Sequence, residues 1–228
     1  MLSQESSVIE LGCGIAGIVG LALAPRISNY VLTDQPYVAK LVEQNIVENS
    51  QTFQRSATTT AGKKHSSSKS KGGRSSSTKS PAVTTTTAAC SNLSFTPLDW
   101  ETDEVTSALT GSSDVKSFDA VVACDCIYNE ALVDPFVSTC ADICRLRADD
   151  ENNEGRKKPC ICVVAQNLRD PAVFETWVTR FTESFHAWRV PDSLLPEQLR
   201  AKAGFVVHIG VLRGTLDETE LLRGTSSR

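Results

Sequence analysis

The sequence contains no apolar run near the roughly 20 residues that a membrane-spanning helix needs. Residues 1–7 also lack the basic start and the apolar stretch of a secretory signal. The Cys-x-x-Cys spacing of zinc sites is missing, since Cys124 and Cys126, like Cys160 and Cys162, stand two apart inside apolar runs. Thiols spaced in this way share one face of a strand and are typical of a core. We therefore expect no membrane contact, no metal site, and a chain with reduced thiols in the cytoplasm or the nucleus.

Acidic residues are absent between residues 50 and 98, a stretch that carries seven Lys and Arg. Residues 50–90 consist mainly of Ser, Thr, Lys and Gly, so they offer almost nothing to bury that could offset the entropy lost on ordering. We predict a disordered insertion there. Without those seven residues, 16 basic residues stand against 27 acidic ones. Such an acidic remainder disfavours direct binding to nucleic acid and suits a basic protein partner.

Apolar segments of strand and helix type alternate along the rest of the chain. Residues 118–126, for example, are almost continuously apolar, which suits a strand covered on both faces of a mostly parallel sheet. The pattern predicts one domain over residues 1–228 with an α/β, Rossmann-like fold: a seven-stranded, mostly parallel sheet with helices on both faces. Only residues 191–202 separate the last two strands, so we expect the last strand to be antiparallel. The predicted strands are 7–11, 29–33, 92–98, 118–126, 160–165, 187–190 and 204–212, and the predicted helices are 16–24, 36–49, 134–147 and 171–185.

Two of the predicted helices carry the same start signal, an Asp followed by a Pro. In Asp134-Pro135 and Asp170-Pro171 the Asp suits an N-cap and the Pro suits the first helical position. We therefore predict that Asp134 and Asp170 cap these helices.

A glycine-rich turn joins the first predicted strand to the first helix, in the segment Glu10-Leu11-Gly12-Cys13-Gly14-Ile15-Ala16-Gly17. The G-x-G-x-x-G spacing of Gly12, Gly14 and Gly17 permits a tight turn and lets a ligand approach the backbone beside the helix N-terminus. The motif alone fits NAD as well as S-adenosylmethionine, and a turn without a ligand is the remaining alternative.

Two carboxylates stand where a nucleoside cofactor needs them. Asp34 ends the second predicted strand, 22 residues after Gly12, and a carboxylate there accepts from the ribose hydroxyls of either cofactor. Glu10 ends the first strand, where its charge suits the ammonium group of S-adenosylmethionine and does not suit a pyrophosphate. Glu10 therefore favours S-adenosylmethionine over NAD.

The third predicted strand ends in Leu98-Asp99-Trp100, at the edge of the sheet where ligands bind. Asp99 could accept from an adenine amino group, and Trp100 could pack on the adenine ring. The alternative is an Asp in a turn and a half-buried Trp.

The fourth predicted strand ends in Cys124-Asp125-Cys126-Ile127-Tyr128 at the same edge. Transfer of a methyl group to an amine needs the amine held in line with the sulfonium and little else. Asp125 could orient the ammonium group before its proton is lost, and Tyr128 could help to fix its position. A helix-capping Asp and a packed Tyr are the alternative. Gln166 and Asn167, after the fifth strand, are candidates for a target channel or for an ordinary loop.

In combination these motifs resemble the seven-strand, class I protein-lysine methyltransferases, which act on chaperones, elongation factors and ribosomal proteins. Residues 125–130 and 204–208 look most like the fungal members that act on a large-subunit ribosomal protein. The resemblance implies S-adenosyl-L-methionine as cofactor and methyl transfer to a lysine ε-amine of a protein. It implies Asp125 and Tyr128 as catalytic residues. The implied cofactor-binding residues are Glu10, Gly12, Cys13, Gly14, Gly17, Asp34, Asp99, Trp100 and Cys124.

The resemblance also implies a monomer whose substrate is a protein, with a ribosomal protein as the candidate, and contact with nucleic acid only through the ribosome. Members of the family usually carry a long segment before the glycine loop, whereas the loop here begins at Gly12. We therefore expect a domain that is short at its N-terminus and binds its cofactor more weakly than full-length members of the family do. The alternatives are a catalytically inactive binding module of the same fold and an NAD-dependent oxidoreductase, which Glu10 and the lack of a Tyr-x-x-x-Lys pair disfavour.

Overall fold

The computed structural model describes residues 2–59, 92–150 and 158–215. Seven strands form one sheet in the order β3-β2-β1-β4-β5-β7-β6. Strands β1 to β5 run parallel, whereas β7 is antiparallel to both of its neighbours. The prediction of a mostly parallel, seven-stranded sheet with an antiparallel last strand is thus confirmed. The strands are β1 (Ser7–Leu11), β2 (Asn29–Asp34), β3 (Leu93–Pro97), β4 (Ala120–Cys124), β5 (Ile161–Asn167), β6 (Phe185–Arg189) and β7 (Phe205–Leu212).

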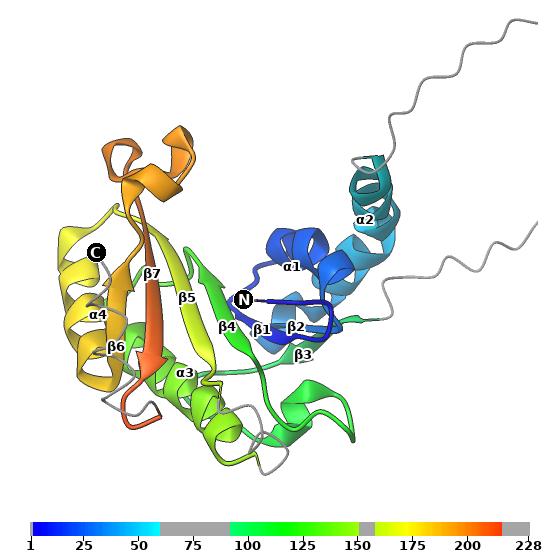
Figure 1. Ribbon diagram of the computed structural model, residues 1–228, viewed down its shortest axis with the longest axis horizontal. Coiled ribbons are helices and arrows are strands. Elements are labelled where there is room, and N and C mark those ends of the chain that lie inside the picture. The colour runs from blue at the N-terminus through cyan, green and yellow to red at the C-terminus, as the bar shows by residue number, and fades with distance from the viewer. Residues whose placement is uncertain (1, 60–91, 151–157, 216–228) are drawn as a thin grey trace, which may run out of the picture.

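The α-helices of the described residues lie in two pairs, one at each half of the sheet (Figure 1). Helices α1 (Ile18–Leu23) and α2 (Ala39–Thr59) pack on each other and on β2 and β3. Helices α3 (Val133–Ala148) and α4 (Pro171–Ser184) pack on each other and on the half that contains β5, β6 and β7. None of the described helices is long and apolar enough to cross a membrane.

Side chains that alternate along the strands supply a separate core on each face of the sheet. In β1, Val8 belongs to the core under α1 and α2, whereas Ile9 belongs to the core under α3 and α4. In β4, Val122 and Val121 are divided in the same way. Burying a side chain of this kind contributes about 1.5–3 kcal/mol. The two cores therefore fix the sheet and, with it, the positions of the loops at the strand ends.

The face of the sheet that carries α1 and α2 has no helix over β5 and β7 within the described residues. Here Val163, Val207 and Ile209 are partly exposed, and Trp188 of β6 is 44% exposed. On the opposite face Val164 is buried beneath the second pair of helices. Helices thus lie on both faces, as predicted, but cover the first face only in part.

Helix α2 continues to Thr59, about ten residues beyond the predicted boundary. Residues 50–59 of the predicted disordered insertion are therefore helical, and residues 60–90 lie outside the described residues. Residues 50–59 contain neither Gly nor Pro, and each residue added to an existing helix gains one backbone hydrogen bond. Composition indicated how little this segment can bury, but it did not indicate where the helix ends.

The prediction that Asp134 is an N-cap is wrong. Helix α3 begins at Val133 with Leu132 as its N-cap, because a 3-10 turn capped by Asn129 leads directly into it. Asp134 lies in the first helical turn, where its Oδ1 pairs with Arg180 Nε of α4 at 2.7 Å.

Asp170, in contrast, caps α4 as predicted. Its Oδ1 accepts from the backbone N–H of Ala172 at 2.9 Å and from that of Val173 at 3.4 Å. Pro171 occupies the first helical position, where a missing N–H costs nothing.

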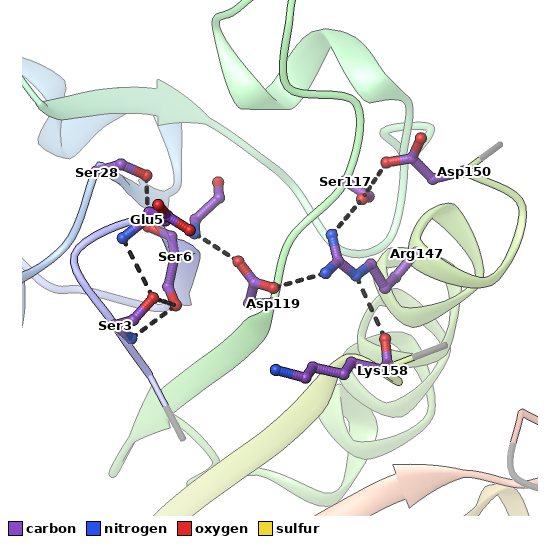
Figure 2. A network of polar contacts seen from close by, with 10 residues as sticks. Ser3, Glu5, Ser6, Ser28, Ser117, Asp119, Arg147, Asp150 and Lys158 are labelled. Atoms are coloured by element: carbon purple, nitrogen blue, oxygen red, sulfur yellow. Dashed lines mark hydrogen bonds and ion pairs between the residues drawn. The ribbon is translucent and has the colours of Figure 1, made fainter. Parts of the chain in front are cut away.

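The amino ends of β1, β4 and β5 are tied together by a polar network (Figure 2). Asp119 accepts from the backbone N–H of Ser7 at 2.8 Å and pairs with Arg147 Nη2 at 2.7 Å. Arg147 also donates to Ser117 Oγ at 3.2 Å and to the carbonyl of Lys158 at 3.4 Å. The network fixes the C-terminal end of α3 against the starts of the strands, at the edge of the sheet opposite to the carboxyl ends of the parallel strands.

Candidate active site

The carboxyl ends of β1, β2 and β4 and the segment after β3 meet around a cavity of about 430 Å³. This volume is typical of small-molecule sites, and the carboxyl edge of an open parallel sheet is where such ligands bind. Of the residues predicted from the sequence, the cavity brings together Gly12, Gly14, Asp34, Trp100, Asp125 and Tyr128.

The glycine loop after β1 packs closely against the segments that follow β3 and β4. Gly12 has a φ of +67°, and a Cβ there would lie 2.5 Å from Cys126 Cβ and 3.3 Å from Trp100 Cζ2. Gly14 has a φ of +61°, but a Cβ there would meet nothing within 4 Å. Both positions favour glycine through their backbone, and Gly12 is also required by packing. The space beside Gly14, in contrast, is free of protein atoms and belongs to the cavity.

Asp34, at the end of β2, holds the glycine loop with its carboxylate. Its Oδ2 accepts from the N–H of Gly14 at 2.8 Å, and its Oδ1 accepts from the N–H of Gln35 at 2.7 Å. Asn45 of α2 supports the same loop by donating to the carbonyl of Ile15 at 2.8 Å. Each carboxylate oxygen of Asp34 keeps further lone-pair capacity, so it can accept from a ligand as well.

Trp100 forms one wall of the cavity. Its indole lies edge-on to Phe136, with ring centroids 5.2 Å apart. Its Nε1 is buried without a hydrogen-bond partner among the described residues, an arrangement that costs about 1–3 kcal/mol unless a ligand or water accepts from it. Asp99 does not line the cavity, and its Oδ1 accepts from the N–H of Glu101 at 2.9 Å in a turn. This is the alternative that the sequence left open for Asp99.

Asp125 follows β4 with a φ of +55°, the left-handed region that a non-glycine residue rarely adopts. Its N–H donates to the carbonyl of Ala165 at 2.8 Å, and its Oδ1 accepts from the N–H of Asn167 at 3.3 Å. Its Oδ2 forms an ion pair with Arg169. These contacts hold the carboxylate between the ends of β4 and β5.

A second cavity, of about 200 Å³, shares Tyr128 with the first one. Tyr128 is 72% exposed, and the second cavity is also lined by Gln166, Asn167, Arg169 and Phe174. Oε1 of Gln166 is buried without a partner among the described residues. Two cavities that meet at one tyrosine, next to a carboxylate, provide places for two reactants.

Glu10 lies beneath the first cavity and does not line it. The residue is only 2% exposed, and its Oε2 accepts from the Tyr30 hydroxyl at 2.8 Å. Burial raises the pKa of Glu10 to about 7, although hydrogen bonds from Tyr30 and from the backbone of Gly20 oppose this rise. The arrangement differs from the direct contact with a ligand ammonium that the sequence led us to expect.

Cys13, Gly17 and Cys124 also lie outside the cavity lining. Gly17 has a φ of +54°, and a Cβ there would lie 3.1 Å from Leu32 Cδ1, so this glycine lets the start of α1 approach β2. Burial raises the pKa of Cys124 to about 11 and that of Cys13 well above its usual value, which makes both thiols poor nucleophiles. These residues support the loop around the cavity.

Sequence reasoning missed several residues that line the first cavity. Gln35, Tyr37 and Val38 follow β2, and Leu132 follows β4. The rule that strand ends meet at one edge applies to them as it does to Asp34. The sequence predicts helices over residues 36–49 and 134–147, and no motif marks these four residues as facing a ligand.

Comparisons with known proteins confirm the resemblance that the motifs suggested. Residues 2–63 match the family model described as lysine methyltransferase. The ribosomal lysine N-methyltransferase 5 of Zygosaccharomyces rouxii is 30% identical over 181 residues, which cover 78% of this chain and 51% of that protein. The protein of the same name from Vanderwaltozyma polyspora is 30% identical over 145 residues, which cover 61% of this chain and 41% of that protein. The chain thus spans about half the length, or less, of these curated relatives.

Solved structures of similar architecture were also found. One is the N-methyltransferase NodS from Bradyrhizobium japonicum in complex with S-adenosyl-L-homocysteine, with a TM-score of 0.47 and 13% identity. The match covers 91% of this chain and 78% of that one.

Proposed function

We propose, from the premise that this chain is a relative of the lysine methyltransferases, that it transfers methyl groups from S-adenosylmethionine to a lysine ε-amine of a protein. The observation that carries the proposal is the meeting of two cavities at Tyr128, beside Asp125. The cofactor supplies a methyl group on a positively charged sulfur, so the protein has only to bind and orient the two reactants.

The larger cavity has the features that a nucleoside cofactor requires. Gly14 leaves room for a ligand at the backbone, and Asp34 retains acceptor capacity for ribose hydroxyls. The buried N–H of Trp100 has no partner among the described residues, and its ring offers a face for adenine. Glu10 contributes from beneath the loop, through its hydrogen bond with Tyr30 and through its charge when it is ionised.

The smaller cavity accepts the lysine side chain. The carboxylate of Asp125 attracts the lysine ammonium, and the hydroxyl of Tyr128 helps to fix its position between the two cavities. The amine loses its proton to water before it attacks, since only a neutral amine has a free electron pair. Holding both reactants in line replaces an encounter in solution by a reaction within one complex.

Thermal unfolding tests the cofactor assignment. S-adenosylmethionine or S-adenosylhomocysteine at about 100 times its Kd should stabilise the folded protein by about 2.7 kcal/mol. For a domain of this size that raises the Tm by roughly 5–10 °C, whereas NAD should cause no shift. Asp34→Asn should weaken cofactor binding about tenfold or more, because a charged acceptor is lost.

The matched control is Asp142→Asn, which changes an exposed carboxylate of α3. This variant should show the full shift with both sulfur ligands. A shift with NAD alone would replace the proposal by an oxidoreductase. No shift with any ligand, from a protein that unfolds cooperatively, would favour an inactive module.

We propose a ribosomal protein as the substrate, since the curated relatives are named for ribosomal lysine methylation. Intact-mass spectrometry of ribosomal proteins after incubation with the protein and S-adenosylmethionine tests this. One ribosomal protein should gain methyl groups after incubation with the wild type. No ribosomal protein should gain them after incubation with Asp125→Asn. Methylation of non-ribosomal proteins only would leave the transfer reaction in place and remove the ribosome as its target.

A further inference from the structure

The carboxylate that faces the junction of the two cavities is already paired with a cation. Asp125 Oδ2 forms an ion pair with Arg169 Nη2, and Arg169 lines the smaller cavity. Asp125 lines the larger cavity, and Tyr128 lines both. The guanidinium of Arg169 therefore lies at the carboxylate to which a target ammonium would bind.

The ion pair between Arg169 and Asp125 can open, so that another cation can take the place of Arg169. The side chains of Arg169 and Asp125 are 60% and 43% exposed, and ion pairs this open to water contribute little stability. Asp125 keeps its position without the pair, because its N–H is bonded to Ala165 and its Oδ1 to the N–H of Asn167. Removing the guanidinium frees the carboxylate without moving it.

We propose that Arg169 stands in for the substrate cation and is displaced when the target lysine enters, so that it acts as both gate and specificity residue. This inference rests on the proposed function. In the free protein Arg169 neutralises Asp125, and a neutral side chain gains nothing by displacing it. A lysine ammonium replaces one cation by another at the same carboxylate, so only a cationic side chain opens the site.

Once displaced, Arg169 carries an unpaired positive charge at the rim of the smaller cavity. The neighbouring Asp170 is held in place as the cap of α4, because its Oδ1 is bonded to the N–H groups at the start of that helix. An acidic group next to the target lysine is the partner that this charge selects. The preferred substrate segment therefore contains a lysine with an adjacent Asp or Glu.

Binding of small lysine derivatives tests the inference without any need for turnover. NMR titrations of the full chain, with S-adenosylhomocysteine present, would compare N-acetyl-lysine amide with N-acetyl-norleucine amide. The Nε–H resonance of Arg169, identified by its loss in Arg169→Lys, should shift with the lysine derivative only. Arg169→Ala should bind this derivative about threefold more tightly, the size expected for loss of an exposed competing cation.

The same titrations with acetyl-Lys-Glu-amide and acetyl-Lys-Gln-amide test the specificity. The wild type should prefer the Glu compound about threefold, and Arg169→Ala should lose this preference. Arg145→Ala is the matched control, because Arg145 is 57% exposed and pairs with a single carboxylate, Asp142. It should behave as the wild type in every titration.

The outcomes separate the two proposals. If lysine is preferred over norleucine but Arg169→Ala changes neither affinity nor the preference for Glu, the role of Arg169 is wrong and the acceptor site stands. If lysine and norleucine derivatives bind equally, the cationic acceptor site itself is wrong, and the inference fails with it.

Discussion

Gly12 and Gly111 share a left-handed backbone but differ in their surroundings. Their φ angles are +67° and +65°, yet a Cβ on Gly12 would meet Cys126 at 2.5 Å and a Cβ on Gly111 would meet nothing within 4 Å. The shared φ angle costs any alanine about 1–2 kcal/mol. The contact with Cys126 belongs to Gly12 alone, because it arises where the loops after β1 and β4 pack against each other.

Gly12→Ala should therefore be the more damaging of two matched substitutions. We expect Gly111→Ala to lower the free energy of unfolding by about 1–2 kcal/mol. Gly12→Ala should lower it by a further 1–3 kcal/mol or so, because the loop must shift away from Cys126. Urea unfolding of both variants measures the difference. Equal losses would mean that packing against Cys126 does not constrain the loop.

Glu10 makes the stability of the protein depend on pH. Its pKa is raised by burial from 4.5 to about 7, so between these values the folded state binds more protons than the unfolded state. Stability must then fall as pH rises through this window, and the loss is complete above the folded pKa. Between about pH 5 and pH 8 the contribution of Glu10 amounts to about 2–3 kcal/mol.

Glu10→Gln should remove this loss while its amide oxygen still accepts from Tyr30. Free energies of unfolding in urea at about pH 5 and pH 8 would be compared for both proteins. Between about pH 5 and pH 8, the free energy of unfolding of the variant should rise by about 2–3 kcal/mol relative to that of the wild type. Parallel pH dependence of the two proteins would show that Glu10 titrates alike in the folded and unfolded states.

At the scale of the elements, α3 and α4 begin with the same Asp-Pro pair but use it differently. Asp170 caps α4 through two backbone N–H groups. Asp134 lies one residue inside α3 and pairs with Arg180 of α4, with its side chain 76% exposed. The 3-10 turn before α3 moved the helix start upstream and left Asp134 without a capping role.

Asp170→Ala should cost about 1 kcal/mol of stability, because two N–H groups lose their acceptor. Asp134→Ala should cost no more than a few tenths of a kcal/mol, since an exposed ion pair contributes little. Parallel urea titrations of the two variants are the measurement. A larger loss for Asp134→Ala would mean that its contact with Arg180, between the two helices, matters more than the cap.

At the scale of the whole molecule, the carboxyl ends and the amino ends of the parallel strands form two separate edges of the sheet with different roles. The carboxyl edge carries both cavities, and the amino edge carries the network of Asp119 and Arg147 (Figure 2). Asp119 joins the start of β1 to the end of α3, while the cores between the edges hold the strands in register. Stability can therefore be changed at one edge without changing the geometry of the other.

Asp119→Ala should lower stability by about 1–3 kcal/mol, because the buried N–H of Ser7 loses its acceptor. Calorimetric affinity for S-adenosylhomocysteine should stay within about twofold of the wild type below the melting transition, since the strand length separates this site from the cavity. A large loss of affinity would show that the two edges are coupled.

The sequence by itself determined the seven-stranded sheet, the mostly parallel direction of its strands and the glycine loop after β1. Alternating apolar segments and the glycine spacing are local patterns, and the rule that parallel strand ends meet at one edge converts them into neighbours. Gly12, Gly14, Asp34, Trp100, Asp125 and Tyr128 were predicted in this way and line one cavity.

Only the tertiary structure decided which polar side chains of this edge are open to a ligand. Glu10 and Asp34 are both carboxylates at strand ends, but Glu10 faces the core beneath α1, where Tyr30 donates to it. Arg169 carries no motif, and its pairing with Asp125 depends on the approach of β4 and β5. Such contacts join residues distant in the chain, so their partners are set by packing, which no local pattern records.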